Sequence, residues 1–427
     1  MGTHSSKSVQ IEGTVAAGFE SVEALYRLNM HNLKELNTQL CVYHRGEKVV
    51  DLWATAGADN GFSPDSLVNV FSSGKSLEAI AIAALVGKGL LAYSDLVSDH
   101  WPAFAGGGKQ GLTVAQLMRH EAGLASFNVS IDPEALLPEN IKRNKVGSTI
   151  EAHGQSFPEG SDREYHAITR GWIVNELFRR VDPAGRTMGE FLREDISEPL
   201  QVDAIIGVKE AELGRIVKVT PLAMSYQFVE GLKPKFWRHM EYNIFQLIAR
   251  MARLIPLMRK TSGKGAPAAM VGMKDVGVFN EELVAMGETP SAGAKCTARG
   301  LAKIGAMMSA GGSFEGTEYL STQGWQALHD EPSKKDMGFS ITTFTQGGVA
   351  QFVDTSAAST KVERAFNVGR EGFYGWMGLG GSIFQWNCQH QIGFGYVPTS
   401  LNILDLFNER GKTYQAEVLN CVQKLGT

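Results

Sequence analysis

Extended hydrophobic runs lie near both ends of the chain. Two β-rich runs, Thr38–His44 and Lys48–Trp53, are separated by Arg45-Gly46-Glu47, a spacing typical of an antiparallel hairpin. Three further runs near the C-terminus have the pattern of strands, and they are Gly338–Phe344, Ser382–Trp386 and Ile392–Val397. We therefore expect strands from both ends of the chain to meet in one antiparallel sheet.

Apolar residues at helical spacing occur in several segments outside these strands. Ser21–Leu36 has this spacing, and Lys75–Val86 is so rich in Ala, Leu and Ile that it predicts a buried helix. Further helices are predicted at Val114–Arg119, Ala167–Arg180, Thr187–Ile196 and Gly411–Leu425. The predicted fold class is α/β, in the form of an α+β sandwich: an antiparallel sheet flanked by helices, with an inserted helical subdomain. We assign the sheet to residues 11–70 and 300–425 and the helical subdomain to about 90–300, within one domain of residues 11–425 that follows a flexible tail of residues 1–10.

Composition narrows the class of protein. The 427 residues are 43% hydrophobic and 20% charged, which is enough apolar sequence for a large core and excludes global disorder. A net charge of −4 gives no global basic bias, so we expect no nucleic-acid partner. The four cysteines form no C-x-x-C pair and fit free thiols in a reducing compartment, which predicts a cytoplasmic protein. The sequence does not predict an oligomeric state.

Two features keep contact with a membrane surface open. Met1-Gly2-Thr3-His4-Ser5-Ser6 fits the pattern for N-myristoylation at Gly2, with a simple flexible tail as the alternative. Residues 231–265 carry eight Lys and Arg residues against the single acid Glu241, interleaved with aromatic and aliphatic residues. This segment fits either a basic amphipathic helix on a membrane or a helical flap over the core. We favour the flap, because aromatic and Met stripes at helical spacing usually pack into a core.

The first candidate chemistry is the sequence Ser72-Ser73-Gly74-Lys75, the only S-x-x-K in the chain. The chain has no G-x-S-x-G and no H-E-x-x-H, and the ten histidines form no obvious ligand cluster, so we expect no metal and no cofactor. A P-loop is excluded because Asn69 stands where its first glycine is needed. Residues three apart share a helix face, so the Lys75 amine can reach the Ser72 hydroxyl. Burial would lower the pKa of Lys75 and let the amine accept the serine proton, although an N-cap serine beside a surface lysine has the same pattern.

The surroundings of this motif resemble the superfamily of serine β-lactamases, penicillin-binding proteins and family VIII carboxylesterases, most of all the last. The similarity starts at Leu67–Lys75 and continues through Gly89-Leu90-Leu91 and Leu112–Leu124. Tyr165-His166-Ala167 resembles the second element of the superfamily, Y-x-N in β-lactamases. Trp376–Gly381 occupies the place of the third, K-T-G or H-x-G. The resemblance runs from about Ile11 to Leu425 and implies a β-lactamase/transpeptidase-like fold.

The resemblance implies a role for each matching residue. Ser72 is the nucleophile that becomes acylated, and Lys75 and Tyr165 share the work of the general base. For Tyr165 this requires a lowered pKa, which we expect a nearby ammonium to provide. The backbone N–H groups of Ser72 and Leu379 form the oxyanion hole. We expect the substrate-binding pocket to be lined by Trp376, Gly378, Gly380, Phe127 and His166. Core packing is the alternative for Phe127, and a structural, hydrogen-bonded role is favoured for His166. Glycines here let the strand approach the substrate.

Two departures from the β-lactamase pattern favour an ester substrate. Ala167 stands where the Asn of Y-x-N is expected, and Trp376 stands where β-lactamases have the Lys that helps to hold the substrate carboxylate. A neutral indole cannot replace that charge, but it can form an apolar wall for an acyl or alcohol group. We therefore predict a serine esterase that acts on a small-molecule ester or amide. β-Lactamase, D-aminopeptidase-type or acyl transferase activity is the alternative within enzymes, and a non-catalytic scaffold or membrane-associated protein with this fold is the alternative of another class.

Overall fold

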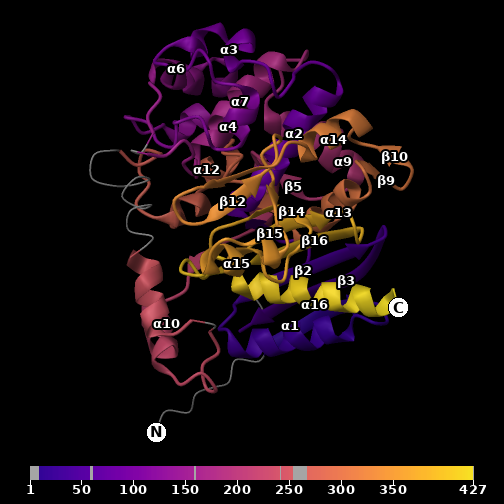
Figure 1. Cartoon of the computed structure of the whole chain (residues 1–427). Helices are drawn as coiled ribbons and strands as arrows, with labels where there is room; N and C mark the ends of the chain where they lie inside the picture. Colours follow the sequence, from indigo (N-terminus) through magenta and orange to yellow (C-terminus); the bar gives the residue numbers. More distant parts are fainter. Residues whose placement is uncertain (1–8, 58–60, 158–159, 241, 253–266, 427) are drawn as a thin grey trace.

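A nine-stranded antiparallel sheet forms the centre of the computed structural model, which describes residues 9–57, 61–157, 160–240, 242–252 and 267–426 (Figure 1). The strands follow the order β1-β3-β2-β16-β15-β14-β13-β12-β11. Their bounds are β1 Val9–Val15, β2 Asn37–His44, β3 Glu47–Ala56, β11 Ser333–Asp336, β12 Ile341–Phe344, β13 Ala350–Gln351, β14 Phe373–Met377, β15 Ile383–Asn387 and β16 Ile392–Pro398. The predicted hairpin is confirmed as β2 and β3, and β2 pairs with β16, so the two ends of the chain do meet in one sheet.

Helices cover both faces of this sheet. The model contains the helices α1 Glu20–Asn32, α2 Lys75–Gly87, α3 Val97–His100, α4 Val114–Met118, α5 Pro138–Lys142, α6 Lys145–Ala152, α7 Thr169–Val181, α8 Met188–Phe191, α9 Glu198–Leu200, α10 Met224–Leu232, α12 Glu282–Met286, α13 Ala298–Ser309, α14 Thr322–His329, α15 Lys361–Asn367 and α16 Glu409–Leu425. Figure 1 shows α1 and α16 side by side under one face, while α13 lies against the opposite face. The sheet is therefore apolar on both sides, and all residues of β15 and β16 are buried.

Glycine allows α13 to lie close against the sheet. A Cβ on Gly393 of β16 would come 2.2 Å from the backbone nitrogen of Ala306 on α13, and one on Gly395 would come 2.4 Å from the Ala298 carbonyl oxygen. Larger residues at these positions would push the helix outward. The predicted sandwich of a sheet between helices is confirmed.

The helical region between the two halves of the sheet contains α3 to α9 and, with them, a second sheet. Four short strands form it in the order β5-β8-β4-β6, with bounds β4 Leu67–Asn69, β5 Ala204–Ile205, β6 Ile216–Val217 and β8 Lys295–Cys296. We expected residues up to 70 to join the main sheet, but β4 pairs with β8 and β6 instead. β4 is three residues long, is fully buried and leads into the turn that carries Ser72.

The basic segment forms a flap at one end of the molecule, where α10 stands at the lower left of Figure 1. After α10, residues 244–252 are helical again. The expectation that its aromatic residues pack into a core is wrong for three of them, because Phe236, Trp237 and Phe245 are exposed. Gly2, residues 1–8 of the expected tail and residues 253–265 of the basic segment lie outside the described residues. No helix in the described ranges is long and apolar enough to cross a membrane.

Candidate active site

Ser72 lies in a single turn of 3-10 helix, Phe71–Gly74, that runs directly into α2. The residue before it, Phe71, has a φ of 47°, a left-handed conformation that costs a bulky residue about 1–3 kcal/mol. Phe71 is buried and packs edge-on against Phe279, with ring centroids 5.5 Å apart. Packing thus holds a sharp bend at the point where the chain presents the Ser72 hydroxyl.

The Lys75 amine lies one helical turn away from this hydroxyl. Its Nζ is 3.4 Å from Ser72 Oγ, and it donates hydrogen bonds to the carbonyl oxygens of Ala167 at 2.7 Å and Ser291 at 3.0 Å. Lys75 is 1% exposed. A neutral amine has two hydrogens and one lone pair, and two carbonyls already take the hydrogens. The lone pair is therefore left to accept the Ser72 proton.

The environment of Lys75 favours this neutral form. Burial lowers the pKa of the amine well below its ordinary value, the charge of Glu78 opposes that shift, and the Arg170 guanidinium adds to it. Arg170 Nε and Glu78 Oε2 form an ion pair of 2.9 Å in which neither side chain is exposed. Ser291 donates a hydrogen bond to the other oxygen of Glu78, so the carboxylate is tied to the same loop that accepts from Lys75. Sequence inspection missed Glu78 and Arg170, because they are far apart in the chain and belong to no motif.

Tyr165 completes the group around Ser72. Its hydroxyl is hydrogen-bonded to the Ser72 side chain and accepts a hydrogen bond of 3.0 Å from Trp376 Nε1. Burial raises the pKa of Tyr165 to about 12, which outweighs the hydrogen bonds that lower it. The expectation of a tyrosine pKa lowered by an ammonium is therefore wrong. Tyr165 is a neutral phenol, which can donate a proton and pass one on, while Lys75 is the group suited to accept the first proton.

Trp376 lies on β14 and forms a wall of the cleft that opens above Ser72. The cleft encloses about 700 Å³ counted to its open mouth. Its lining is mainly apolar and consists of Ser72, Tyr165, Phe339, Phe366, Trp376, Met377, Gly378, Leu379, Gly380, Ile403, Asp405, Leu406 and Asn408. Among the described residues that line it, none is Lys or Arg, and the one charged side chain is the acidic Asp405.

The end of β14 is fastened to the turn that carries Ser72. Gly378 donates its N–H to the Ser382 carbonyl, and Ser382 Oγ donates to the Val70 carbonyl at 2.6 Å. A Cβ on Gly378 would lie 2.1 Å from that Val70 oxygen, so only glycine permits this approach. Asn408 donates to the carbonyls of both Gly378 and Ser382, at 3.1 and 2.9 Å. Leu379, the next residue, is thereby fixed at the rim of the cleft near Ser72, where an oxyanion donor is needed.

Two of the predicted pocket residues lie elsewhere. Phe127 lines a different, smaller cavity and stacks on Trp172, with centroids 6.3 Å apart. His166 is fully buried: its Nδ1 donates to the Glu164 carbonyl at 2.6 Å, and its Nε2 accepts from the Leu124 N–H at 3.0 Å. Burial lowers the pKa of His166 to about 3, so it is neutral. Both ring nitrogens are occupied, and His166 positions the loop before α7 and does not line the cleft.

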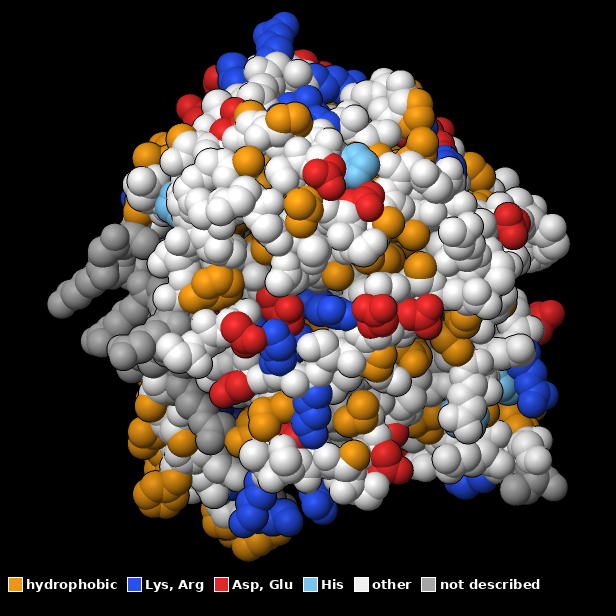
Figure 2. All heavy atoms as spheres, turned by 45° about the horizontal axis from the view of Figure 1, so that its top comes forward, with side chains coloured by type: hydrophobic (Ala, Val, Ile, Leu, Met, Phe, Trp, Pro, Cys, Tyr) orange, Lys and Arg blue, Asp and Glu red, His pale blue; other side chains and the backbone are white. Residues whose placement is uncertain are grey.

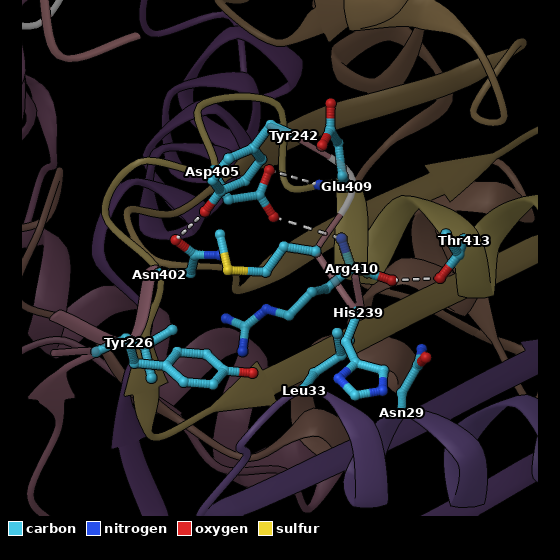
Figure 3. Close-up of a pocket in the computed structure, with 12 residues that line it drawn as sticks. Asn29, Leu33, Tyr226, His239, Tyr242, Asn402, Asp405, Glu409, Arg410 and Thr413 are labelled. Carbon is cyan, nitrogen blue, oxygen red and sulfur yellow. Dashed lines mark hydrogen bonds between the residues drawn. The ribbon is translucent and has the colours of Figure 1, made fainter. Parts of the chain in front are cut away.

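A second cavity lies behind the loop 402–409 that lines the cleft. Asp405 borders both cavities, and Figure 3 shows it among polar side chains that include Tyr242, Asn402, Glu409 and Arg410. Arg410 pairs with the buried Glu35 and donates to the Gly380 carbonyl, one residue beyond Leu379. Among the described residues that line this cavity there is no serine, and Arg410 links the cavity to the Gly380 carbonyl just after β14. Within the described ranges, no cluster of three or more His, Cys, Asp or Glu residues could hold a metal ion.

Comparison with known proteins agrees with this geometry. A family model described as Beta-lactamase matches residues 22–411. The chain belongs to the Beta-lactamase family. This member of the Beta-lactamase family is 30% identical over 298 residues to Esterase/beta-lactamase LipL of Mycobacterium tuberculosis, and the match spans 66% of the chain and 61% of that relative's length.

Solved structures of the Beta-lactamase fold are similar over nearly the whole chain. A penicillin-binding protein homologue from Caulobacter crescentus is 28% identical with a TM-score of 0.74, covering 96% of this chain and 100% of that one. A family VIII carboxylesterase has the same TM-score and coverage at 24% identity, a level at which the likeness shows the fold. The resemblance found in the sequence is thus confirmed, and the family assignment supports a hydrolase.

Proposed function

We propose that this protein is a serine esterase that acts through a covalent acyl–Ser72 intermediate. The observation that carries the proposal is the placement of Ser72 Oγ between the buried amine of Lys75 and the hydroxyl of Tyr165, at the foot of an apolar cleft. A serine hydroxyl is a weak nucleophile unless a neighbouring base takes its proton. Lys75 meets this need, because its pKa is lowered and its two hydrogens are held by carbonyls.

The proposed reaction has two halves of the same form. Lys75 accepts the Ser72 proton while Oγ bonds to the ester carbonyl carbon, and the displaced electron pair on oxygen is stabilised by the amides of Ser72 and Leu379. The C–O bond to the alcohol then breaks, and the leaving alkoxide takes a proton from the Tyr165 hydroxyl, which regains one from the Lys75 ammonium. In the second half Lys75 accepts a proton from water as the water oxygen bonds to the acyl carbon. The bond from that carbon to Ser72 Oγ then breaks, Oγ takes a proton from Tyr165, Tyr165 regains one from the Lys75 ammonium, and the acid is released. An alcohol or amine in place of water would make the protein an acyl transferase.

The lining of the cleft supports an ester in preference to a β-lactam. A β-lactam substrate carries a carboxylate that needs a cation, whereas Trp376 is neutral and Asp405 would repel it. An apolar wall of Trp376, Phe339 and Phe366 suits an uncharged acyl or alcohol group. The LipL relative is named for both esterase and beta-lactamase activity, so the preference for an ester rests on the lining of the cleft.

The test is turnover of a short-chain p-nitrophenyl ester together with labelling by a fluorophosphonate probe. We expect the wild-type protein to do both and Ser72→Ala to do neither. Ser73→Ala is the matched control, because Ser73 is the adjacent serine, but it is fully buried with its hydroxyl 3.1 Å from that of Ser382. A wild-type protein that is folded but not labelled, or equal turnover by Ser72→Ala, would overturn the proposal.

A further inference from the structure

The exposed hydrophobic side chains of the protein are concentrated on the flap formed by α10 and the residues that follow it. The most exposed large hydrophobic residues of the described chain are Phe245 at 77%, Phe236 at 76%, Leu232 at 69% and Trp237 at 65%. Met224, Val229 and Ile248 in the same segment are also exposed. Side chains of this kind scattered singly are ordinary, but a contiguous group of them marks an interaction surface.

The flap has apolar residues on both of its faces, and the other described residues cover only the inner face. Its inner face packs through Met240, Tyr242 and Leu247 against Leu404. Tyr242 donates a hydrogen bond of 2.8 Å to Asn402 (Figure 3), and Arg250 forms an ion pair of 2.8 Å with Glu409 at the start of α16. The flap is thereby fastened to the loop 402–409, so its outer face has a defined position.

Helical spacing separates the two faces in residues 244–252. Leu247 is buried and Ile244 and Met251 are half-buried, whereas Phe245 and Ile248 point to solvent one helical turn apart. An apolar stripe that faced no partner would be unfavourable in water, and a surface helix of a soluble protein usually has a polar outer face. Within the described ranges this outer face is uncovered, so it is available to a partner.

The charge around this face is basic. Lys233, Lys235 and Arg238 lie beside Phe236 and Trp237, and the nearby acid Glu230 is buried and paired with Lys233. Figure 2 shows hydrophobic and basic side chains gathered along the lower left edge of the molecule, where Figure 1 places α10. Exposed aromatic residues flanked by Lys and Arg complement a membrane interface, where aromatic rings lie at headgroup depth and basic groups contact anionic headgroups.

We propose that the outer face of this flap, Leu232, Phe236, Trp237, Phe245 and Ile248 with the exposed Lys235, docks on the surface of anionic membranes. The aromatic and aliphatic side chains enter the interface, and the Lys235 ammonium contacts the lipid headgroups. This proposal does not depend on the esterase activity. It places the loop 402–409, and with it one wall of the cleft, on the side of the protein that faces the membrane.

Co-sedimentation of the full chain with vesicles tests the proposal. We expect binding to phosphatidylcholine vesicles that contain phosphatidylserine, weaker binding to phosphatidylcholine alone, and a loss of binding as salt is raised. The triple variant Phe236→Ser, Trp237→Ser, Phe245→Ser should bind at least about tenfold more weakly. Lys235→Glu, which reverses one exposed charge, should weaken binding by at least about fivefold.

The matched control replaces three exposed hydrophobic residues outside the flap, Val129→Ser, Leu283→Ser and Val368→Ser. We expect this control to bind vesicles like the wild type, and thermal unfolding of every variant shows that it is folded. Wild-type protein that stays in the supernatant, or a folded triple variant that binds as tightly as the wild type, would overturn the proposal. So would a wild-type dimer, detected by light scattering without lipid, that the triple variant dissociates, because a second copy would then be the occupant.

Discussion

Trp376 Nε1 donates a hydrogen bond of 3.0 Å to the hydroxyl oxygen of Tyr165, which is itself hydrogen-bonded to Ser72. The indole thereby occupies a lone pair of Tyr165 and leaves the phenol hydrogen free to point at Ser72. Trp376 thus has two functions in the proposed site: it forms a wall of the cleft, and it orients the group that passes the proton.

Replacement of Trp376 by Phe separates these two functions. Phe keeps an aromatic wall but has no N–H, so Tyr165 loses a buried hydrogen bond worth about 0.5–1.5 kcal/mol. We expect kcat for a p-nitrophenyl ester to fall by about tenfold, with a smaller change in KM, because orientation of Tyr165 matters most as the proton moves. Steady-state kinetics measures the two parameters separately.

Trp386→Phe is the matched control for this substitution. Trp386 lies on the neighbouring strand β15, is fully buried, and donates its indole N–H to His329 at 3.0 Å. The same chemical change there should lower the melting temperature but leave kcat close to the wild-type value. An unchanged kcat in Trp376→Phe, or an equal loss in both variants, would contradict the role assigned to Trp376.

The lowered pKa of Lys75 predicts the pH dependence of turnover. The amine must be neutral to accept the Ser72 proton, so kcat/KM should fall as the pH drops through the pKa of Lys75 and should level off above it. Because burial sets that pKa well below its ordinary value, the acid limb of the profile should lie well below the ordinary pKa of lysine. Lys75→Arg keeps a cation that does not deprotonate, and we expect a loss of at least about 10³-fold at every pH.

A pH–rate profile of kcat/KM for the wild type and Lys75→Arg checks this. An activity that appears only near the ordinary pKa of lysine, about 10.4, would show that Lys75 is not the base in its neutral form. Substantial turnover by Lys75→Arg would lead to the same conclusion.

The buried pair of Glu78 and Arg170 predicts a large effect of one neutral substitution. Glu78→Gln leaves the fully buried Arg170 without its charged partner, which should lower the free energy of unfolding by about 3–5 kcal/mol. It also removes the charge that raises the pKa of Lys75, so the acid limb of kcat/KM should move to lower pH. Urea unfolding and the pH–rate profile measure the two effects.

Glu23→Gln provides the comparison, since Glu23 pairs with Arg27 on the exposed side of α1. An exposed pair contributes at most about 1 kcal/mol, so this variant should unfold nearly like the wild type. Equal destabilisation by the two substitutions would show that burial does not increase the contribution of the Glu78–Arg170 pair to the free energy of unfolding.

The absence of a cation in the lining of the cleft predicts poor turnover of β-lactams. A hydrogen bond to a charged group contributes about 1.5–3 kcal/mol. The substrate carboxylate would meet Trp376 and Asp405 where a β-lactamase provides a cation. We expect kcat/KM for nitrocefin to be about 10- to 150-fold below that for a short-chain p-nitrophenyl ester. Spectrophotometric assay of both substrates on one preparation is sufficient, and comparable values would contradict the preference for esters.

The parts of this structure that were predictable from the sequence are those with a local signal. The hairpin of β2 and β3 has two β-rich runs around Arg45-Gly46, and α2 has a run of helix formers. Ser72, Lys75 and Tyr165 lie in short motifs whose order in the chain is informative. The pairing of β4 outside the main sheet was not predictable, because a strand of only three residues, Leu-Val-Asn, carries no information about its partner strand.

Other features depend on contacts between distant segments. Glu78, Arg170 and Ser291 look like ordinary helix and loop residues, and their network exists only once α2, α7 and the loop before β8 meet. The pKa of Tyr165 was predicted in the wrong direction, because burial, which the sequence does not reveal, outweighs a neighbouring charge. The exposure of Phe236 and Trp237 was likewise hidden, because α10 ends at Leu232 and both residues lie in a turn outside any helix.

The most direct test of the proposed mechanism is the mass of the protein during turnover. After rapid acid quench of a reaction with a p-nitrophenyl ester, intact-mass spectrometry should show an adduct of one acyl group, and peptide fragmentation should place it on Ser72. Ser72→Ala should show no adduct, while Ser73→Ala should show the same adduct as the wild type. An adduct on any other residue, or steady turnover with no acyl adduct at the earliest quench times, would contradict the covalent Ser72 mechanism.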